Sequence, residues 1–258
     1  MEEYKIEKID DKHYLINDSQ LCTTYIIIGD NKAMVIDCGM KNNESLLNQI
    51  KKITDKDLIV VLTHAHYDHS GHLDEFDHFY MAKEDEICLK KYPIHQQNKL
   101  YLKDQMEFDL GNIKVRSYVF NGHTSGSTIF IDETYHYAYT GDQFGSGCGV
   151  WMQVSEACCL SEYIINIKRF LKILESYSYP LEKWCLFGGH YGQEYTSRVS
   201  SYNPLNIEMV KNLMILSQKL IDNEVELQDS NATSFNSEKS YYAVYKNAEM
   251  VIRKSLIK

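Results

Sequence analysis

The residues best suited to chemistry form a histidine-rich segment between positions 64 and 72. Its potential metal ligands are His64, His66, Asp68, His69 and His72. They follow the apolar run 58–62, whose β-branched composition predicts a buried strand that ends where the histidines begin. Imidazole and carboxylate groups are ligands that divalent transition metals accept. Because alternate side chains of extended backbone face the same way, we expect His64, His66 and Asp68 to point into one cleft.

Three more potential ligands occur beside glycine further along the chain. His123 lies in the segment N-G-H-T-S-G-S, and Asp142 follows T-G at the end of an apolar run. His190 lies in F-G-G-H-Y-G, after the short apolar run 184–187. Each of these residues is therefore predicted to follow the end of a strand, as the histidine-rich segment does.

The whole pattern resembles the metallo-β-lactamase superfamily, whose signature is a strand followed by T-H-x-H-x-D-H-x-G. Residues Thr63 to Gly71 match every fixed position of that signature. Members of the family carry a later His, Asp and His in the order in which His123, Asp142 and His190 occur here. The resemblance implies seven ligands for two metal ions: His64, His66 and His123 for the first, Asp68, His69 and His190 for the second, and Asp142 as a bridge.

Seven ligands are too many for one tetrahedral metal, so we expect two divalent ions, zinc first, with iron or manganese as alternatives. A water between two cations loses a proton near neutral pH. The resulting metal-bridging hydroxide is expected to cleave a small ester, thioester or lactone. Asp68 is predicted to orient this hydroxide, and Tyr191 to donate a hydrogen bond to the developing oxyanion, although chance placement explains Tyr191 equally well. The resemblance also assigns Asp37 to the support of the ligand loop.

Several alternative activities exist within the same resemblance. Asp142 stands where well-known zinc β-lactamases carry a cysteine, which disfavours antibiotic hydrolysis and resembles glyoxalase II and lactonases. Val150 and Trp151 stand where glyoxalase II has a basic residue for glutathione, so a general thioesterase or lactonase is the better description. The alternatives are an iron-dependent oxidoreductase of the persulfide dioxygenase kind, and a β-lactam or phosphodiester hydrolase.

Length and composition favour a single domain over residues 1–258, because 258 residues with 44% hydrophobic content can form one large core. A formal net charge of −9 disfavours nucleic-acid binding. Neither a signal peptide nor a membrane-spanning apolar run is visible in the sequence. We therefore expect a cytoplasmic protein that acts on a small molecule without a nucleic-acid or membrane partner, and leave a homodimer open. The seven cysteines lack regular spacing, so we interpret most of them as small buried hydrophobic residues.

The secondary-structure pattern must place these residues at strand ends. Alternating apolar positions predict antiparallel strands in the first 36 residues, and a period of three to four predicts a helix at 161–177. Two further helices are predicted at 206–222 and 241–257, so that C-terminal helices from about 205–258 pack on the domain. The pattern alone indicates a mixed α/β protein. The resemblance implies a four-layer αβ/βα sandwich of the metallo-β-lactamase type.

Overall fold

The computed structural model describes residues 4–19, 22–90, 98–145, 149–190, 205–230 and 238–258 of the chain. Its first sheet has seven strands, in the order β1-β2-β3-β4-β5-β6-β7. The four N-terminal strands are antiparallel, and β4, β5, β6 and β7 run parallel to one another. The bounds of these strands are β1 (Tyr4–Lys8), β2 (His13–Asp18), β3 (Thr23–Ile28), β4 (Lys32–Ile36), β5 (Asp57–Val61), β6 (Phe79–Met81) and β7 (Lys99–Tyr101).

Two further sheets follow. The second sheet has the order β13-β11-β10-β9-β8, and the third has the order β12-β16-β15-β14. The second sheet comprises β8 (Glu107–Asp109), β9 (Lys114–Val119), β10 (Thr128–Asp132), β11 (Tyr137–Gly141) and β13 (Cys185–Gly188). The third comprises β12 (Val150–Met152), β14 (Gln228–Asp229), β15 (Ser240–Tyr245) and β16 (Ala248–Arg253).

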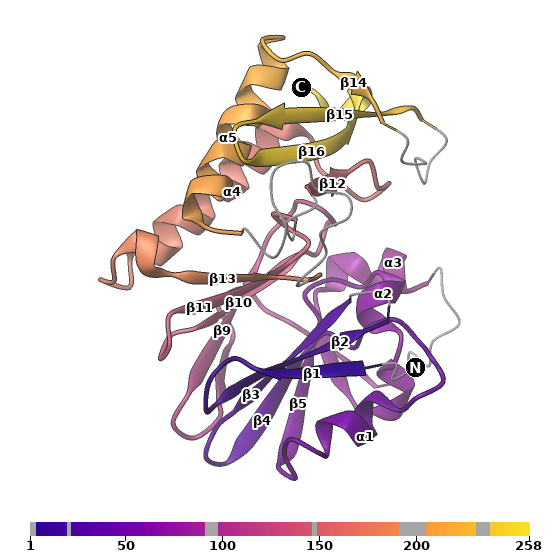
Figure 1. Ribbon diagram of the computed structural model, residues 1–258, viewed down its shortest axis with the longest axis vertical. Coiled ribbons are helices and arrows are strands. Elements are labelled where there is room, and N and C mark those ends of the chain that lie inside the picture. The colour runs from indigo at the N-terminus through magenta and orange to yellow at the C-terminus, as the bar shows by residue number, and fades with distance from the viewer. Residues whose placement is uncertain (1–3, 20–21, 91–97, 146–148, 191–204, 231–237) are drawn as a thin grey trace.

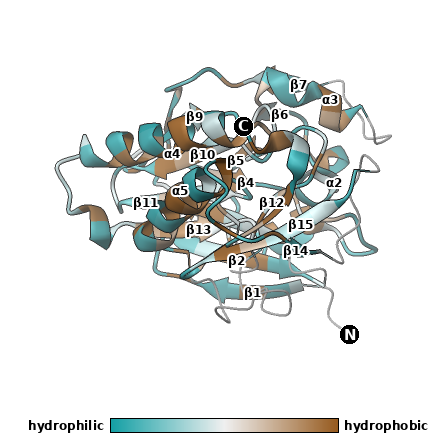
Figure 2. Cartoon of the chain, turned by 90° about the horizontal axis from the view of Figure 1, so that it is seen from above, coloured by the Kyte–Doolittle hydropathy of each residue, from teal (hydrophilic) through white to brown (hydrophobic). Residues whose placement is uncertain are grey.

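The helices are short on the first sheet and long on the second. Three short helices accompany the first sheet: α1 (Leu46–Ile50), α2 (Tyr67–Ser70) and α3 (Glu86–Leu89). The long helices are α4 (Leu160–Glu175) and α5 (Ile207–Ile221), and both carry alternating apolar and polar segments in Figure 2, as expected for helices with one buried face. Single turns of 3-10 helix lie at Leu73–Glu75, Lys83–Asp85, Leu181–Lys183 and Lys254–Leu256.

Figure 1 shows the sheets and helices arranged in layers. Three hydrophobic clusters lie between these layers. One cluster lies between the first two sheets and joins residues such as Met34 and Ile36 to Phe130 and Tyr139. A second packs α1 and α3 on the outer face of the first sheet. The third packs α4, α5 and the third sheet on the outer face of the second sheet. The order helix, sheet, sheet, helix confirms the predicted mixed α/β, four-layer αβ/βα sandwich.

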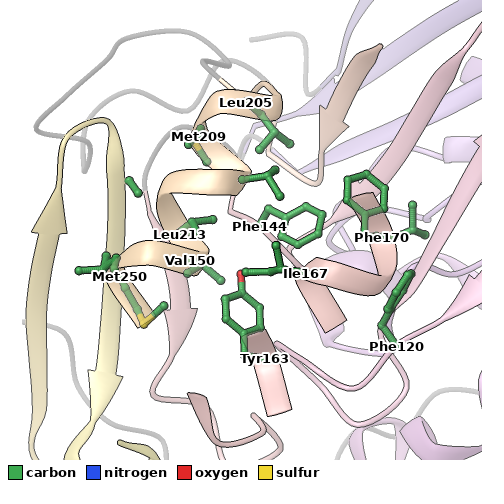
Figure 3. Packing of buried hydrophobic residues seen from close by; sticks show 14 of the residues in the cluster. Phe120, Phe144, Val150, Tyr163, Ile167, Phe170, Leu205, Met209, Leu213 and Met250 are labelled. Atoms are coloured by element: carbon green, nitrogen blue, oxygen red, sulfur yellow. The ribbon is translucent and has the colours of Figure 1, made fainter. Parts of the chain in front are cut away.

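The third cluster also accounts for residues that follow Asp142 in the sequence. Phe144 is fully buried against α4, where its ring lies 5.0 Å from that of Phe170 (Figure 3). Met152 is buried in the same cluster, whereas Trp151 is half-buried. Core packing therefore explains Phe144 and Met152.

The predicted helix at 241–257 is wrong, because this segment forms the hairpin of β15 and β16. Aromatic and β-branched residues, which favour a pleated surface, are frequent in β15 (S-Y-Y-A-V-Y), and β16 contains Val251 and Ile252. Ala248, Met250 and Ile252 of β16 belong to one hydrophobic cluster, as alternate residues of a strand do. Lys246, in the two-residue loop, has a φ of 52°, which suits a tight hairpin turn. The predicted helix at 206–222 is confirmed as α5, and the single domain over 1–258 stays a prediction.

Within the described part of the chain, each helix is too short or too polar to span a lipid bilayer.

Candidate metal centre

All seven predicted ligands lie together at one edge of the two central sheets. His64 and His66 follow β5, and Asp68 and His69 belong to α2, which begins directly after them. The remaining ligands follow strands of the second sheet, with His123 after β9, Asp142 after β11 and His190 after β13. The two sheets meet face to face, so their strand ends bring residues more than 100 positions apart into one cluster.

The first group of the centre consists of His64, His66 and His123. One ring nitrogen of each lies within 4.8 Å of the others. His123 Nε2 lies 3.0 Å from His66 Nδ1, and the ring centroids of the three residues are 4.7 to 5.0 Å apart. This geometry suits one metal ion held by three imidazoles.

The second group contains Asp68, His69 and His190. His190 Nε2 lies 3.5 Å from Asp68 Oδ2, and His69 Nε2 lies 3.7 Å from the same oxygen. Asp142 faces both groups, because its Oδ2 is 3.3 Å from His190 Nε2 and 3.8 Å from His123 Nε2. Its Oδ1 is 3.6 Å from His69 Nε2. Asp142 therefore has the position required of a bridging carboxylate.

Buried atoms of this centre lack hydrogen-bond partners. Among the described residues, His64 Nε2, His69 Nε2 and Asp142 Oδ1 make no hydrogen bond. An unsatisfied buried polar atom costs about 1–3 kcal/mol, so their convergence on one place requires a reason. A donor set of imidazole nitrogens and carboxylate oxygens fits zinc, iron or manganese, and such ions would satisfy these atoms.

The electrostatics divide the histidines into two kinds. Burial lowers the pKa of His64 well below its usual value and that of His123 to about 4, and neighbouring imidazoles act in the same direction. Burial also opposes the charged forms of His69 and His190, but nearby groups outweigh it and raise both pKa values well above 6.5. These groups are chiefly Asp68 and Asp142 for His69, and Asp142 for His190. His64 and His123 are thus neutral and ready to bind metal, whereas His69 and His190 hold protons that a metal must displace.

Asp37 supports the ligand loop as predicted. It lies just beyond β4 with a φ of 65°, a backbone conformation that residues other than glycine rarely adopt. Its carboxylate accepts hydrogen bonds from the Thr63 backbone N–H and Thr63 Oγ1, both at 2.7 Å, and from His69 Nδ1 at 3.0 Å. Since Nδ1 donates to Asp37, Nε2 is the ring nitrogen of His69 that faces the metal centre.

Two glycines permit the close approach of the ligand segments. A side chain at Gly189 would place its Cβ 2.4 Å from Asp142 Oδ1 and 2.6 Å from His69 Cε1. Gly141 has a φ of 51°, and a Cβ there would lie 2.4 Å from Thr63 Oγ1. The glycines beside Asp142 and His190 in the sequence are thus steric requirements of the centre.

Asp85 is a positioning residue that the sequence analysis did not identify. Its buried carboxylate accepts hydrogen bonds from Ala65 N at 2.9 Å, Thr124 Oγ1 at 2.9 Å and Gly126 N at 2.7 Å. Burial raises its pKa. Asp85 thereby joins the loop of His64 and His66 to the loop of His123. In the sequence it lies in an acidic run, K-E-D-E, that is typical of an exposed helix, so no local signal marks it.

Glu156 and Cys22 are two further residues that sequence reasoning missed. Glu156 Oε2 lies 3.9 Å from His66 Nε2, and its side chain is only 5% exposed. The Sγ of Cys22 groups with one oxygen of Asp68 and one nitrogen of His190, all within 4.8 Å of one another. Both residues come from loops remote in sequence from the histidine motif, which is why no motif spacing includes them.

Two residues singled out in the sequence lie outside this centre or outside the described residues. His72 is buried elsewhere, with Nδ1 2.6 Å from Glu75 Oε1 and Nε2 2.9 Å from Tyr4 Oη. Its role is therefore to hold the segment after α2 against β1. Tyr191 falls outside the described residues, and its role as an oxyanion donor stays a prediction.

A family model described as the metallo-beta-lactamase superfamily matches residues 19–190 of the chain. Solved structures support the same fold. A metallo-beta-lactamase from Pontibacter korlensis superposes with a TM-score of 0.65 at 15% identity, over 83% of this chain and 99% of that one. The DIM-1 metallo-beta-lactamase gives a TM-score of 0.63 at 18% identity, over 84% of this chain and 98% of that one. At such identities the likeness concerns the fold alone.

Curated relatives match shorter segments. BaeB of Bacillus velezensis, a probable polyketide biosynthesis zinc-dependent hydrolase, is 33% identical over 115 residues, or 40% of this chain and 49% of that protein. PksB of Bacillus subtilis, which carries the same description, is 30% identical over 97 residues, or 35% and 41%. The metallo-beta-lactamase fold-containing protein ST1585 of Sulfurisphaera tokodaii is 24% identical over 159 residues, or 49% and 58%. The chain thus spans about half the length of the curated relatives it matches.

Proposed function

The chain belongs to the metallo-β-lactamase superfamily, and from this premise we propose that it is a dinuclear metal-dependent hydrolase of a small ester, thioester or lactone. The observation that carries the proposal is the convergence of buried, unpartnered ligand atoms: His64 Nε2, His69 Nε2 and Asp142 Oδ1. The description of BaeB and PksB as zinc-dependent hydrolases supports zinc as the first choice of metal.

Different residues of the chain have different roles in such a site. Two bound cations supply Lewis acidity and bring the pKa of a water close to neutrality. Asp142 lies between the two groups and would reduce the repulsion between two cations bound there. Asp37 and the Trp151 carbonyl fix the ring orientation of His69 and His123, because each accepts the Nδ1 hydrogen.

The substrate is expected on the side of Asp68. Its side chain is 31% exposed, whereas those of Asp142 and His190 are 17% and 13% exposed and that of His69 is fully buried. A carboxylate with one edge toward solvent is suited to orient the attacking water and to take up its proton. Tyr191, which directly follows His190, keeps its proposed role as a hydrogen-bond donor to the oxyanion.

Turnover assays test this proposal. Zinc-loaded protein should hydrolyse members of a panel of small thioesters, lactones and esters, and Asp142→Ala should lower kcat/KM by about a thousandfold, equivalent to about 4 kcal/mol. Asp132→Asn is the control, because Asp132 is a fully buried carboxylate that pairs with His13 away from the centre. Oxygen uptake on persulfides with a single iron would favour the oxidoreductase instead. Cleavage of only β-lactams or phosphodiesters would contradict the proposed substrate class.

A further inference from the structure

Cys22 brings a sulfur donor to the second group of the metal centre. The residue is 2% exposed, and its Sγ lies within 4.8 Å of a ring nitrogen of His190 and an oxygen of Asp68. We propose that Cys22 is a thiolate ligand at the second metal position, beside Asp68 and His190. This inference rests on the proposed two-metal function and adds a ligand to it.

Hydrogen bonds on both sides fix the position of Cys22. Its backbone N–H donates to Asp18 Oδ1 at 3.0 Å, and its carbonyl accepts from the Asp18 N–H at 3.1 Å. The next residue, Thr23, donates its N–H to the Gly189 carbonyl at 2.8 Å. The start of β3 is therefore tied to the residue that precedes His190, so the approach of sulfur to imidazole follows from the backbone.

The side chains around this sulfur converge on one carboxylate oxygen. Asp68 Oδ2 lies 3.5 Å from His190 Nε2 and 3.7 Å from His69 Nε2. His69 Nε2 is fully buried and makes no hydrogen bond among the described residues, which is a second sign that an ion belongs here. The Sγ of Cys22 lies within 4.8 Å of a ring nitrogen of His190, which is close enough for both atoms to bind one ion.

The chemistry of sulfur distinguishes this arrangement from one of imidazole and carboxylate alone. Coordination to the ion breaks the S–H bond, forms a metal–sulfur bond and releases one proton to solvent, without any oxidant. Thiolate favours zinc over manganese, which prefers oxygen ligands. The second position should therefore discriminate against manganese more strongly than the first, whose ligands are three imidazoles and the shared carboxylate of Asp142.

A second thiol lies near the first group and offers a matched comparison. The Sγ of Cys88 lies within 4.8 Å of one nitrogen of His66 and one oxygen of Glu156. His66 Nε2 is the nitrogen near Glu156, whereas His66 Nδ1 faces His123 and the first metal position. Cys88 is thus expected behind the ligand ring of His66, where its sulfur does not reach the ion.

Absorption of the cobalt(II)-loaded full chain tests the proposal independently of activity. A thiolate ligand gives a sulfur-to-cobalt charge-transfer band in the near ultraviolet, which imidazole and carboxylate ligands do not give. Wild-type protein with two cobalt ions should show the band, Cys22→Ser should lose it, and Cys88→Ser should keep it. The Cys22→Ser protein should also bind its second cobalt about tenfold more weakly. Circular dichroism of each metal-free variant checks its folding.

X-ray absorption of zinc-loaded wild-type protein provides a second test that needs no variant. It should show a sulfur neighbour at about 2.3 Å from zinc.

The cobalt experiment can overturn Cys22 as a ligand and leave the two-metal function standing. It does so if two cobalt ions bind per chain without the band, or if the band persists in Cys22→Ser or disappears in Cys88→Ser. Fewer than two ions per chain, measured by elemental analysis of the same samples, would contradict the two-metal function itself.

Discussion

His123 donates its Nδ1 hydrogen to the backbone carbonyl of Trp151 at 2.8 Å, which directs Nε2 into the metal centre. Trp151 belongs to β12, and β12 pairs with β16 near the C-terminal end of the chain, where Trp151 faces Val251. The predicted metal ligand His123 is therefore oriented by a strand that the C-terminal hairpin holds in place.

Truncation of a core side chain in this hairpin should weaken the fold. Ile252 is fully buried in β16, so Ile252→Ala should lower the free energy of unfolding by about 2–4 kcal/mol. Ile165→Ala is the matched control, since Ile165 is 64% exposed on α4 and its loss should cost less than about 0.5 kcal/mol. Urea denaturation of the two variants checks this. Equal losses would mean that the hairpin is not packed as described.

Replacement of Asp37 by asparagine should reduce metal affinity at the second position. An amide N–H beside His69 Nδ1 would turn the proton toward Nε2, so that the ring no longer presents a lone pair to the ion. Zinc affinity should fall about 10–100-fold. Asp132→Asn alters an equally buried carboxylate that pairs with His13, and should leave zinc affinity unchanged. Competition with a zinc chelator measures both, and a similar decrease in the two variants would contradict a specific role for Asp37.

Loss of the Asp85 carboxylate should separate the two ligand loops. Asp85→Ala leaves three buried donors of Ala65, Thr124 and Gly126 without an acceptor, so stability should fall by about 2–5 kcal/mol. Asp85→Asn retains an acceptor oxygen and should lose less. Thermal unfolding of both variants measures which one loses more stability. A smaller loss for the alanine variant than for the asparagine variant would contradict this role.

Zinc uptake should depend on pH in a direction set by the second group. The pKa values of His69 and His190 lie well above 6.5, because Asp68 and Asp142 outweigh the burial of His69 and Asp142 outweighs that of His190. Metal must therefore displace their protons. In the metal-free protein the charged forms of His69 and His190 stabilise the fold. This contribution is present in full below pH 6.5 and is lost as the pH rises through the raised pKa values of the two residues. Apparent zinc affinity should therefore rise with pH above 6.5.

Calorimetric titration in buffers of different ionisation enthalpy measures the protons released on zinc binding. About two protons are expected near pH 7 from His69 and His190, and one more if Cys22 binds as a thiolate. Zinc binding without proton release would contradict the charged state of the second group.

Local sequence carried most of the information on the ligands. The motif 63–71 and the glycine-flanked His123, Asp142 and His190 each lie at a strand end, and the folding of two sheets face to face brings such ends together. The hairpin at 240–253 was not predictable in the same way. The apolar positions of this segment fit the period of a helix as well as that of a strand. It forms strands because β15 and β16 pair with each other and β16 pairs with β12.

The supporting residues were harder to find than the ligands. Asp85, Glu156 and Cys22 act across loops that are distant in sequence, and each lies in a segment of ordinary composition. Their roles follow from tertiary contacts, which a single sequence does not specify. The role of Asp37 could be predicted from the sequence, because this residue directly follows a strand in the region of the family resemblance.

Elemental analysis of metal content per chain, on protein purified without added metal, tests the central claim most directly. The account predicts two ions per chain, zinc or a mixture of zinc, iron and manganese, and a decrease in Asp142→Ala because the bridging carboxylate is lost. One tightly held iron per chain would contradict the dinuclear hydrolase and favour the oxidoreductase. No bound metal after incubation with zinc would mean that the seven residues do not form a metal centre.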